Sequence, residues 1–404
     1  MKVLTPLTLL WLLSSSHLLA ENNNSLESYI SELKVKQYSL DYEKNEADAS
    51  LLRDSWINPL NLNYTYSKSN PYDSVQTNQS AAIRVDQPIF KSGGIYFGIK
   101  YAEAMRDYRN YSVDVAKRKM IKNAVSLLMQ IKQVEMKIER QKLQIENSNI
   151  NLELKKEQYL NGQLDSGFLD SAIIERNRAT QALYDIETAK ERLISSFKAI
   201  SSLSYKEAKI PHLELISEDE FKKNNLLLDM ASAKEDMDRE NKNVTISKYL
   251  PQLNFVGGYN WTKNENRAMP IGESERDYYD YGVRASLALS INTLRDVESS
   301  RVVFLKSKLQ KKDREIESHL LFEKVMQNIN NSERKSSLAQ ENAELRLKLL
   351  NDTKKLSSAG YKTQHDVDML QNSLSISKLD SKIYELDKQL ELLNLYEVYA
   401  KSGK

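Results

Sequence analysis

The side chains that most often carry enzymatic or metal chemistry are few in this sequence and far apart. The chain contains no cysteine, which excludes thiolate nucleophiles, thiolate metal ligands and disulfides. Beyond the first twenty residues the histidines are His212, His319 and His365, and each falls in a different predicted element. No metal site or nucleophile–base pair can be written from them. We therefore expect no enzyme activity, no metal and no cofactor.

The composition excludes a further class of function. Of the 404 residues, 28% are charged and 40% hydrophobic, with only 11 Gly and 7 Pro, which is typical of long helices rather than of rounded domains. The formal net charge is only +2. Binding of nucleic acid through phosphate neutralisation has no support from such a charge, so we expect no nucleic-acid partner.

The N-terminal segment resembles a secretory signal peptide. Lys2 precedes an apolar run from Val3 to Leu13, which is shorter than the ~20 residues that a membrane-spanning helix needs. We expect cleavage after Ala20, so that residues 1–20 form the signal peptide. A membrane anchor is the alternative interpretation of the same segment.

Aromatic residues and arginines recur in four segments that alternate with the period of two typical of β-strands. Together with their polar, turn-rich loops, these segments predict β-hairpins over residues 58–90 and 251–291. Five aromatic residues fall on the apolar faces of the strands: Tyr64, Tyr66, Tyr259, Trp261 and Tyr281. Arg84 and Arg284 fall on the polar faces, at corresponding positions of the second and fourth strands.

Helical patterns fill most of the remaining sequence. Two long helical hairpins are predicted over residues 95–205, with a tip near 162, and over 296–400, with a tip near 360. The longest helices, of about 60 residues, would measure ~90 Å. Shorter helices are predicted over 21–53 and 217–248, the second with Ser217 as its N-cap. The second long helix carries an apolar stripe: Leu309, Ile316, Leu320, Ile329, Leu338, Leu345 and Leu349.

The order of helix, β-hairpin and long helical hairpin occurs twice. Arg84 and Arg284, like Gly162 and Gly360, are separated by about 200 residues, which indicates an internal duplication. We therefore predict a first structural repeat over 21–210 and a second over 211–404. The predicted fold class is mainly α, with long antiparallel coiled-coil helices and a small β part.

The predicted strands cannot form a complete barrel within one chain. Alternating strands with aromatic residues near their ends are typical of outer-membrane β-barrels, but the smallest of these have ~8 strands. An open sheet edge in lipid leaves backbone groups unpaired, at a cost of several kcal/mol each. We therefore expect a barrel shared between chains, with twelve strands from a homotrimer. The edge of a water-soluble β-sandwich is the alternative interpretation.

Together these features resemble the TolC-like outer membrane efflux proteins, also called outer membrane factors, over essentially the whole length that follows the signal peptide. Single motifs in this resemblance are weak, whereas their order and duplication are specific. The residues that carry it are Tyr249-Leu250-Pro251 before the third strand, Tyr159-Leu160-Asn161-Gly162 followed by Leu169-Asp170 at the first tip, and Gly360-Tyr361-Lys362-Thr363 followed by Asp366-Val367 at the second.

The resemblance implies a homotrimer in the outer membrane of a Gram-negative cell, with a transmembrane β-barrel continuous with a periplasmic α-barrel. It implies that the helical tips dock a periplasmic adaptor (membrane fusion) protein, which connects the trimer to an inner-membrane pump or ABC transporter. The implied function is the exit duct of a tripartite efflux pump or of a type I secretion system. A secreted or surface coiled-coil structural protein or adhesin without a pore is the alternative.

The resemblance also implies roles for residues at the second tip. The family commonly restricts its closed periplasmic entrance with acidic residues on the return helix of the second repeat, and Asp366 stands at the matching place. Lys362 and Asp368 are the other gate candidates. A second acid is expected three residues after Asp366, where Met369 stands, so a doubled acidic ring is in doubt. The alternative for Asp366 is an ordinary acid near a helix start, favoured there by the helix dipole.

The other candidate residues fall into three groups. The tip turns and adaptor-docking positions are Gly162, Gly360, Asp170 and Thr363. Arg84 and Arg284 are candidates for the barrel lumen, with a salt bridge to Asp86 or a neighbour as the alternative. The aromatic residues of the strands are expected to face outer membrane lipid.

Overall fold

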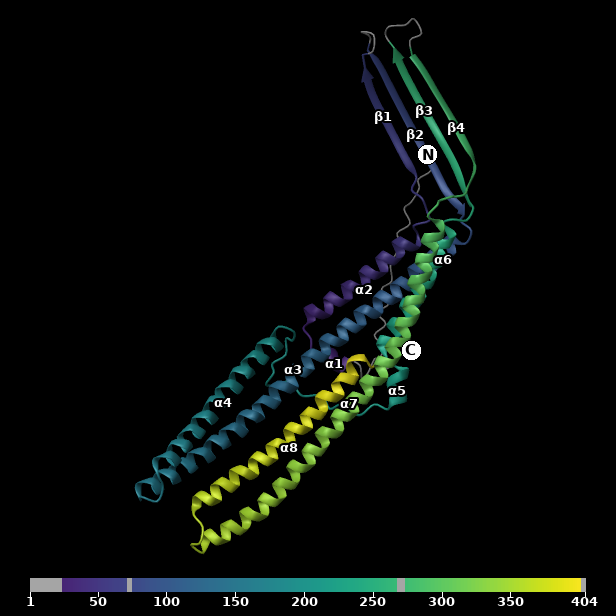
Figure 1. Ribbon diagram of the computed structural model, residues 1–404. Coiled ribbons are helices and arrows are strands. Elements are labelled where there is room, and N and C mark those ends of the chain that lie inside the picture. The colour runs from purple at the N-terminus through teal and green to yellow at the C-terminus, as the bar shows by residue number, and fades with distance from the viewer. Residues whose placement is uncertain (1–23, 71–74, 267–272, 401–404) are drawn as a thin grey trace, which may run out of the picture.

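A computed structural model of the protein describes residues 24–70, 75–266 and 273–400 (Figure 1). The predicted signal peptide, residues 1–20, lies outside the described residues. The helices are α1 (Asn24–Glu27), α2 (Glu32–Arg53), α3 (Gly94–Leu160), α4 (Ser166–Lys198), α5 (Glu218–Lys223), α6 (Leu226–Ser247), α7 (Thr293–Ser358) and α8 (Gln364–Val398). The strands are β1 (Asn61–Ser69), β2 (Gln76–Phe90), β3 (Gln252–Asn266) and β4 (Glu273–Ser286).

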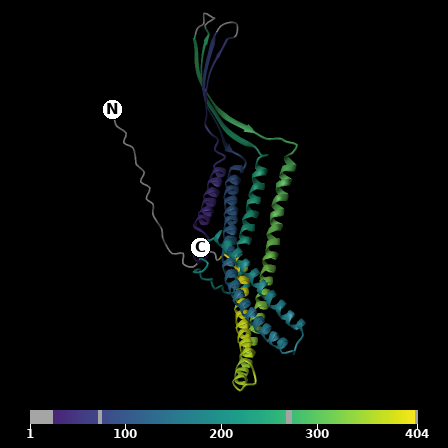
Figure 2. The ribbon, with the colours of Figure 1, turned by 90° about the vertical axis from the view of Figure 1, so that its left-hand side faces the viewer.

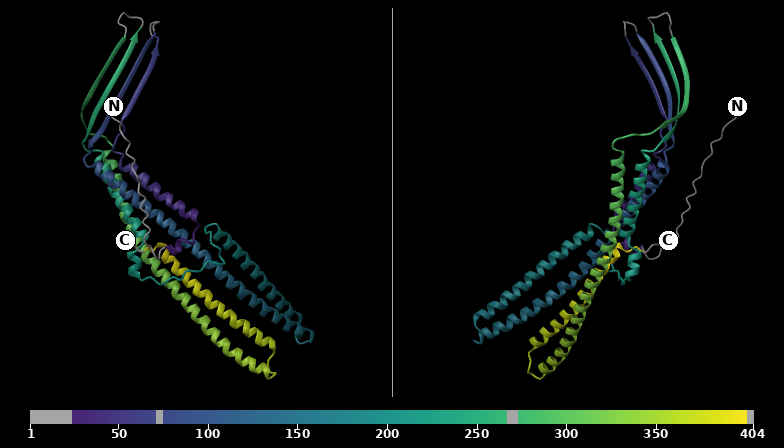
Figure 3. Two further views of the ribbon diagram at one scale, coloured as in Figure 1. Left: turned by 180° about the vertical axis from the view of Figure 1, so that it is seen from behind. Right: turned by 45° about the vertical axis from the view of Figure 1, so that its right-hand side comes forward.

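The molecule is elongated, with a sheet at one end and two helical tips at the other (Figure 1). The sheet is an antiparallel meander in the order β1-β2-β3-β4. Figure 3 shows from two further sides that the tips of the α3–α4 and α7–α8 hairpins both point away from the sheet. The fold is therefore mainly helical with one small sheet, as the sequence predicts.

The helices form a single row that continues the row of strands. Near the sheet, α2, α3, α6 and α7 lie side by side in that order (Figure 2). Toward the tips, α4 replaces α2 beside α3, and α8 replaces α6 between α3 and α7. The row therefore contains four helices along its whole length, and only α3 and α7 run continuously from the sheet to the tips.

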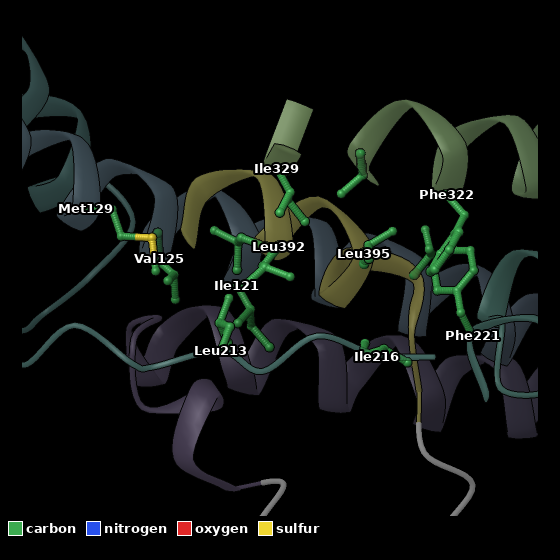
Figure 4. Close-up of a cluster of buried hydrophobic side chains, with 14 of the residues drawn as sticks. Ile121, Val125, Met129, Leu213, Ile216, Phe221, Phe322, Ile329, Leu392 and Leu395 are labelled. Atoms are coloured by element: carbon green, nitrogen blue, oxygen red, sulfur yellow. The ribbon is translucent and has the colours of Figure 1, made fainter. Parts of the chain in front are cut away.

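The main hydrophobic core is a belt halfway along the helices. Side chains from α3, α7 and α8 meet there with side chains from the segment 199–217 and from α5 (Figure 4). Buried Gln389 of α8 fixes the crossing segment, because its side-chain amide bonds both the N–H and the C=O of Leu213, at 2.8 and 3.4 Å. The belt thus joins the first helical hairpin to the second.

Two of the predicted short helices are interrupted. The helix predicted over 21–53 consists of α1 and α2, because Ser31 has extended backbone and its N–H bonds the C=O of Ile200 instead of continuing the helix. The helix predicted over 217–248 consists of α5 and α6. Ser217 caps α5 as predicted, but buried Asn225 then starts α6 by accepting the N–H groups of Leu227 and Leu228.

The hairpins also differ from the prediction at their ends. β2 and β3 extend into the polar segments 68–79 and 263–276, whose sequence predicts loops, because their cross-strand pairing continues to Gln76 and Asn266. At the other end β4 stops at Ser286, although the alternating pattern continues to Ile291. The partner strand begins at Gln252 directly after Pro251, which has no N–H to donate, so nothing in β3 can pair with the residues beyond Ser286.

Candidate functional site

The strand register places the five predicted aromatic residues on one face of the sheet. Residues opposite each other on paired strands point to the same face, and successive residues point to opposite faces. Tyr64 is opposite Ala81, which is opposite Trp261. Tyr66 and Tyr259 are two residues away from Tyr64 and Trp261 on the same strands, and Tyr281 is opposite Gly257, two residues before Tyr259. Tyr64, Tyr66, Tyr259 and Tyr281 are all exposed.

The same face contains further apolar residues that the sequence analysis did not single out. Phe255, Tyr279 and Val283 lie on it and are exposed, and Tyr279 stacks on Tyr281 with ring centroids 6.4 Å apart. Tyr279 could have been found from its spacing of two from Tyr281 in the sequence. This face is therefore aromatic and aliphatic across all four strands toward the helices, while at the far end the Trp261 N–H bonds Glu275 at 2.7 Å and the Tyr259 hydroxyl bonds Asp277 at 3.1 Å.

The opposite face of the sheet is polar and carries both predicted arginines. Arg84 is opposite Asn61 and Gly258, and Arg284 is opposite Asn254. The Arg284 guanidinium donates to one oxygen of Asp86 at 2.7 Å, and the Asn254 amide donates to the other oxygen at 2.7 Å. Arg284 thus forms the salt bridge to Asp86 that the sequence analysis left open.

Arg84 has a different environment from Arg284. Its side chain is exposed and forms no ion pair with a residue in the described part of the chain. The two arginines occupy the same polar face, but only Arg284 is neutralised by a carboxylate. The sequence offset of about 200 residues therefore predicted two arginines on one face of the sheet, but not the difference in their contacts.

Each side of the molecule ends in an edge that no other described element covers. The outer strands β1 and β4 each have a single neighbour in the sheet. In the helical row, α7 packs on α6 and α8 through one side only. Of the predicted apolar stripe of α7, only Ile329 is buried, whereas the other leucine and isoleucine side chains are more than half exposed: Leu309, Ile316, Leu320, Leu338, Leu345 and Leu349.

The opposite edge of the helical row also exposes apolar side chains. Leu33 and Leu51 of α2 are 76% and 77% exposed, and Tyr184 of α4 is 61% exposed. An exposed apolar patch of this extent is characteristic of an interaction surface rather than of a monomer in water. We refer below to the exposed stripe of α7 as the α7 seam.

The two helical tips have the same turn, and glycine allows it in each. Gly162 and Gly360 have φ of +69° and +80°, in the left-handed region that favours glycine. In the first tip Gly162 N–H bonds Tyr159 C=O at 3.0 Å and Gln163 N–H bonds Gln158 C=O at 2.8 Å. The second tip repeats both bonds, from Gly360 to Ser357 C=O and from Tyr361 to Leu356 C=O. These are Schellman motifs, which end α3 and α7.

At the second tip Asp366 belongs to a capping box with Thr363. The Asp366 carboxylate accepts the backbone N–H of Thr363 at 3.0 Å and its hydroxyl at 2.9 Å, and the Thr363 hydroxyl oxygen accepts the Asp366 N–H at 3.2 Å. These bonds, first the one from the backbone N–H, lower the pKa of Asp366, and the charge of Lys362 adds to the effect. The geometry of the single chain is thus that of an acid capping a helix start.

The other predicted tip residues are spread over the two turns. Asp368 accepts a hydrogen bond from the Gln364 amide at 2.7 Å, one turn along α8. In the first tip Asp165, rather than Asp170, caps α4, by accepting the N–H of Gly167 at 2.7 Å. Asp170 is exposed on the first turns of α4. The tips are therefore solvent-exposed turns, which combine these polar groups with the exposed side chains of Leu160, Phe168 and Tyr361.

Within the described residues, no group of three or more histidine and carboxylate side chains is placed to hold a metal ion. In the same part of the chain, no helix has both the length and the hydropathy to cross a bilayer.

Comparison with known proteins relates the chain to others by structure and not by sequence. No protein-family model matches the sequence, and no curated protein matches it either. The structure is similar to the outer membrane protein VceC of Vibrio cholerae, with a TM-score of 0.72 and 12% identity, over 93% of this chain and 96% of VceC.

Two further solved structures resemble the chain. The CmeC outer membrane channel of Campylobacter jejuni has a TM-score of 0.72 and 11% identity, over 94% of this chain and 86% of CmeC. The MtrE outer membrane channel of Neisseria gonorrhoeae, in its open state, has a TM-score of 0.62 and 11% identity, over 92% and 86%. The protein therefore has the fold of these outer membrane channels, and the TolC-like fold predicted from the sequence is confirmed.

We predict that the capping box fixes the first turn of α8. Thr363→Ala removes the hydroxyl that bonds Asp366 and should weaken this turn by about 1 kcal/mol, which speeds local amide exchange about fivefold. Asp366→Asn should have a similar effect near neutral pH, whereas Asp368→Asn, on the same turn, should leave exchange of residues 359–367 unchanged. Exchange measured by mass spectrometry on peptides that cover this tip checks both results.

The stability of the first turn of α8 should depend on pH, because the pKa of Asp366 is lowered in the folded protein. Its stabilising contribution is present above the ordinary carboxyl pKa of 3.8 and is lost as the pH falls through the lower folded pKa. The tip should therefore open in acid in the wild-type protein, and the Asp366→Asn variant should not show this added acid sensitivity. An identical acid response in both proteins would contradict the role of the carboxylate.

Proposed function

We propose that the protein is one subunit of a trimeric outer membrane channel-tunnel, which serves as the exit duct of a tripartite efflux pump or a type I secretion system. The observation that carries this proposal is the combination of an amphipathic four-stranded sheet with uncovered edges and a helical row whose edges are also uncovered. In a single chain the sheet and the helical row both have uncovered edges. A ring of identical chains related by a rotation axis would cover the edges of both.

The sheet supports insertion into a membrane as part of a shared barrel. Its aromatic face can contact lipid while its polar face lines a lumen, as in outer-membrane barrels. Two copies would supply eight strands, with little room for a lumen, and three copies supply twelve. In this arrangement β4 of one copy pairs with β1 of the next, so no strand edge remains in the lipid.

The helical row supports the same assembly. Placing β4 next to β1 of a neighbouring copy also brings α7 toward the α2–α4 edge of that copy, because each helix row continues its strand row. The α7 seam then packs on exposed apolar side chains such as Leu33 and Leu51. Each leucine that becomes fully buried contributes on the order of 2 kcal/mol, so the repeated contacts along α7 would make a stable interface.

The direction of the molecule follows from these two layers. With the sheet in the outer membrane of a Gram-negative cell, the helices extend into the periplasm and the two tips lie furthest from the membrane (Figure 1). The matching Schellman turns at Gly162 and Gly360 present two similar exposed ends for docking a periplasmic adaptor. The adaptor would connect the trimer to an inner-membrane pump or ABC transporter.

The candidate residues take roles within this assembly. Arg84, Arg284 and Asp86 would line the lumen near the base of the barrel, and the aromatic face would contact lipid. Asp366 and Lys362 would lie at the periplasmic entrance with Asp368. There Asp366 acts first as the cap of α8, and the charge of three such carboxylates would also surround the entrance.

The outward direction of the aromatic face can be tested with brominated phospholipids. In a Trp11→Phe/Trp56→Phe variant the only remaining tryptophan is Trp261, and its emission should be quenched because it faces acyl chains. The matched reporter is Thr65→Trp combined with replacement of all three native tryptophans by Phe. Thr65 lies within one register position of Trp261 but on the polar face, so its reporter should not be quenched. Equal quenching of both would contradict membrane insertion through this sheet.

The trimer interface can be tested on the α7 seam. Leu338→Lys together with Leu345→Lys should abolish the heat-sensitive trimer band on electrophoresis and the trimer in sedimentation, because a buried ammonium group costs several kcal/mol in each interface. The control is Ser337→Lys, the exposed neighbour of Leu338 outside the seam. A chain that stays monomeric and extracts with water-soluble proteins in its wild-type form would instead favour the coiled-coil structural protein.

Docking at the tips can be tested by photo-crosslinking in cells. A benzoylphenylalanine introduced at Tyr361 or Gln163 should form an adduct that mass spectrometry identifies as a periplasmic adaptor protein. Tyr96, which is 60% exposed at the sheet end of α3, is the control position and should form no such adduct. Adaptor adducts from Tyr96 and none from the tips would contradict the proposed direction of the duct.

A further inference from the structure

A cleft of about 350 Å³ lies at the junction between the helical row and the sheet. Its walls come from the end of α2, the beginning of α3 and the end of α6, which meet just below the strands (Figures 1 and 2). Three of its lining residues are basic, namely Arg53, Lys91 and Lys248, and none is acidic. A concave site with this composition is positive in potential.

The positive charges in the cleft are largely uncompensated. Lys91 and Lys248 form no ion pair within the described part of the chain, although most basic residues nearby do, such as Lys100 with Glu103 at 3.0 Å. Arg53 contacts Asp54 at 3.2 Å, but Asp54 does not line the cleft. The Nε and Nη2 groups of Arg53 donate to the two Asp54 oxygens at 3.2 and 3.4 Å, and because this pair is solvent-exposed it contributes little, so the main uncompensated charges are Lys91 and Lys248.

The cleft also has an apolar side. Trp56 and Tyr101 are partly buried in its wall, together with aliphatic side chains such as Ile95. Gly98 lies on the face of α3 that lines the cleft, and a Cβ built on it meets no atom within 4 Å. The absence of a side chain at this position therefore leaves open space between the basic and aromatic residues.

We propose that this cleft binds a small organic anion with a planar apolar group, of which an aromatic carboxylate is the simplest example. Lys91, Lys248 and Arg53 hold the carboxylate through charge-assisted hydrogen bonds, and the ring packs against Trp56 and Tyr101. The site does not depend on the proposed channel function, because its residues all belong to one chain.

Equilibrium dialysis of the purified protein in non-ionic detergent, with labelled benzoate as the probe, tests the site. Benzoate should bind saturably, with one site per chain, and benzamide, which has the same ring without the charge, should bind at least about tenfold more weakly. In a Trp11→Phe/Trp261→Phe variant, benzoate should change the emission of Trp56. Inorganic phosphate should compete only weakly, because it lacks the ring.

Two sets of variants separate binding in the cleft from binding elsewhere. Lys91→Gln and Lys248→Gln should each weaken benzoate binding about threefold to tenfold, while Lys100→Gln, the same charge change on α3 outside the cleft, should leave it unchanged. Gly98→Leu should fill the cleft and abolish binding, whereas Gly98→Ala should retain most of it. Because the space at Gly98 is open, both should fold, which circular dichroism checks.

Three results would overturn the proposal. Equal affinities for benzoate and benzamide would remove the role of the basic residues, and phosphate binding more tightly than benzoate would remove the role of the aromatic wall. Benzoate binding by the Gly98→Leu variant with wild-type affinity would place the anion outside the cleft. None of these outcomes bears on membrane insertion or trimer formation, so failure here is distinguishable from failure of the proposed function.

Discussion

The need to pair the edges of a four-stranded sheet is the constraint on which the architecture depends. β1 and β4 each have a single neighbour, and the aromatic face of the sheet has no covering layer among the described elements. In water this face would be an exposed apolar patch, and in lipid the open strand edges would be more costly still. The proposed assembly, which closes the sheet, would remove both problems, and the helical row also has uncovered edges on the same two sides.

Because each strand is joined to a helix, the same proposed assembly of chains would cover the edges of the sheet and those of the helical row. Four strands lead into four helices, and α4 and α8 take the places of α2 and α6 toward the tips, so the width of the wall does not change along the molecule. In the belt, side chains of α3 pack with those of α7 and α8 and hold the two helical hairpins together, while Gln389 fixes the crossing segment at Leu213. A wall of constant width is what a tube built from several identical chains requires.

Polar contacts distinguish positions that the predicted duplication treats as corresponding. Arg284 is held by Asp86 while Arg84 is unpaired among the described residues, and Thr363 caps α8 through a box with Asp366 while α4 is capped by Asp165 alone. The junction cleft likewise collects polar groups from separate elements, because its three basic residues come from the end of α2, from the residue after α6 and from the turn before α3. The two hairpin pairs therefore have the same order of elements and different polar contacts.

The sequence by itself determined the kind and order of the elements, because the period of two in the strands, the long helical stripes and the glycines at the tips are local signals. Interrupted helices at Ser31 and Asn225 and the early end of β4 were decided by tertiary structure. Ser31 bonds the C=O of Ile200, the Asn225 amide donates to the Ser318 hydroxyl at 2.7 Å, and β4 ends where β3 begins. The same holds for the α7 seam. An apolar stripe read along one helix cannot tell a buried core from an uncovered edge, because that distinction depends on how many neighbours the helix has in space.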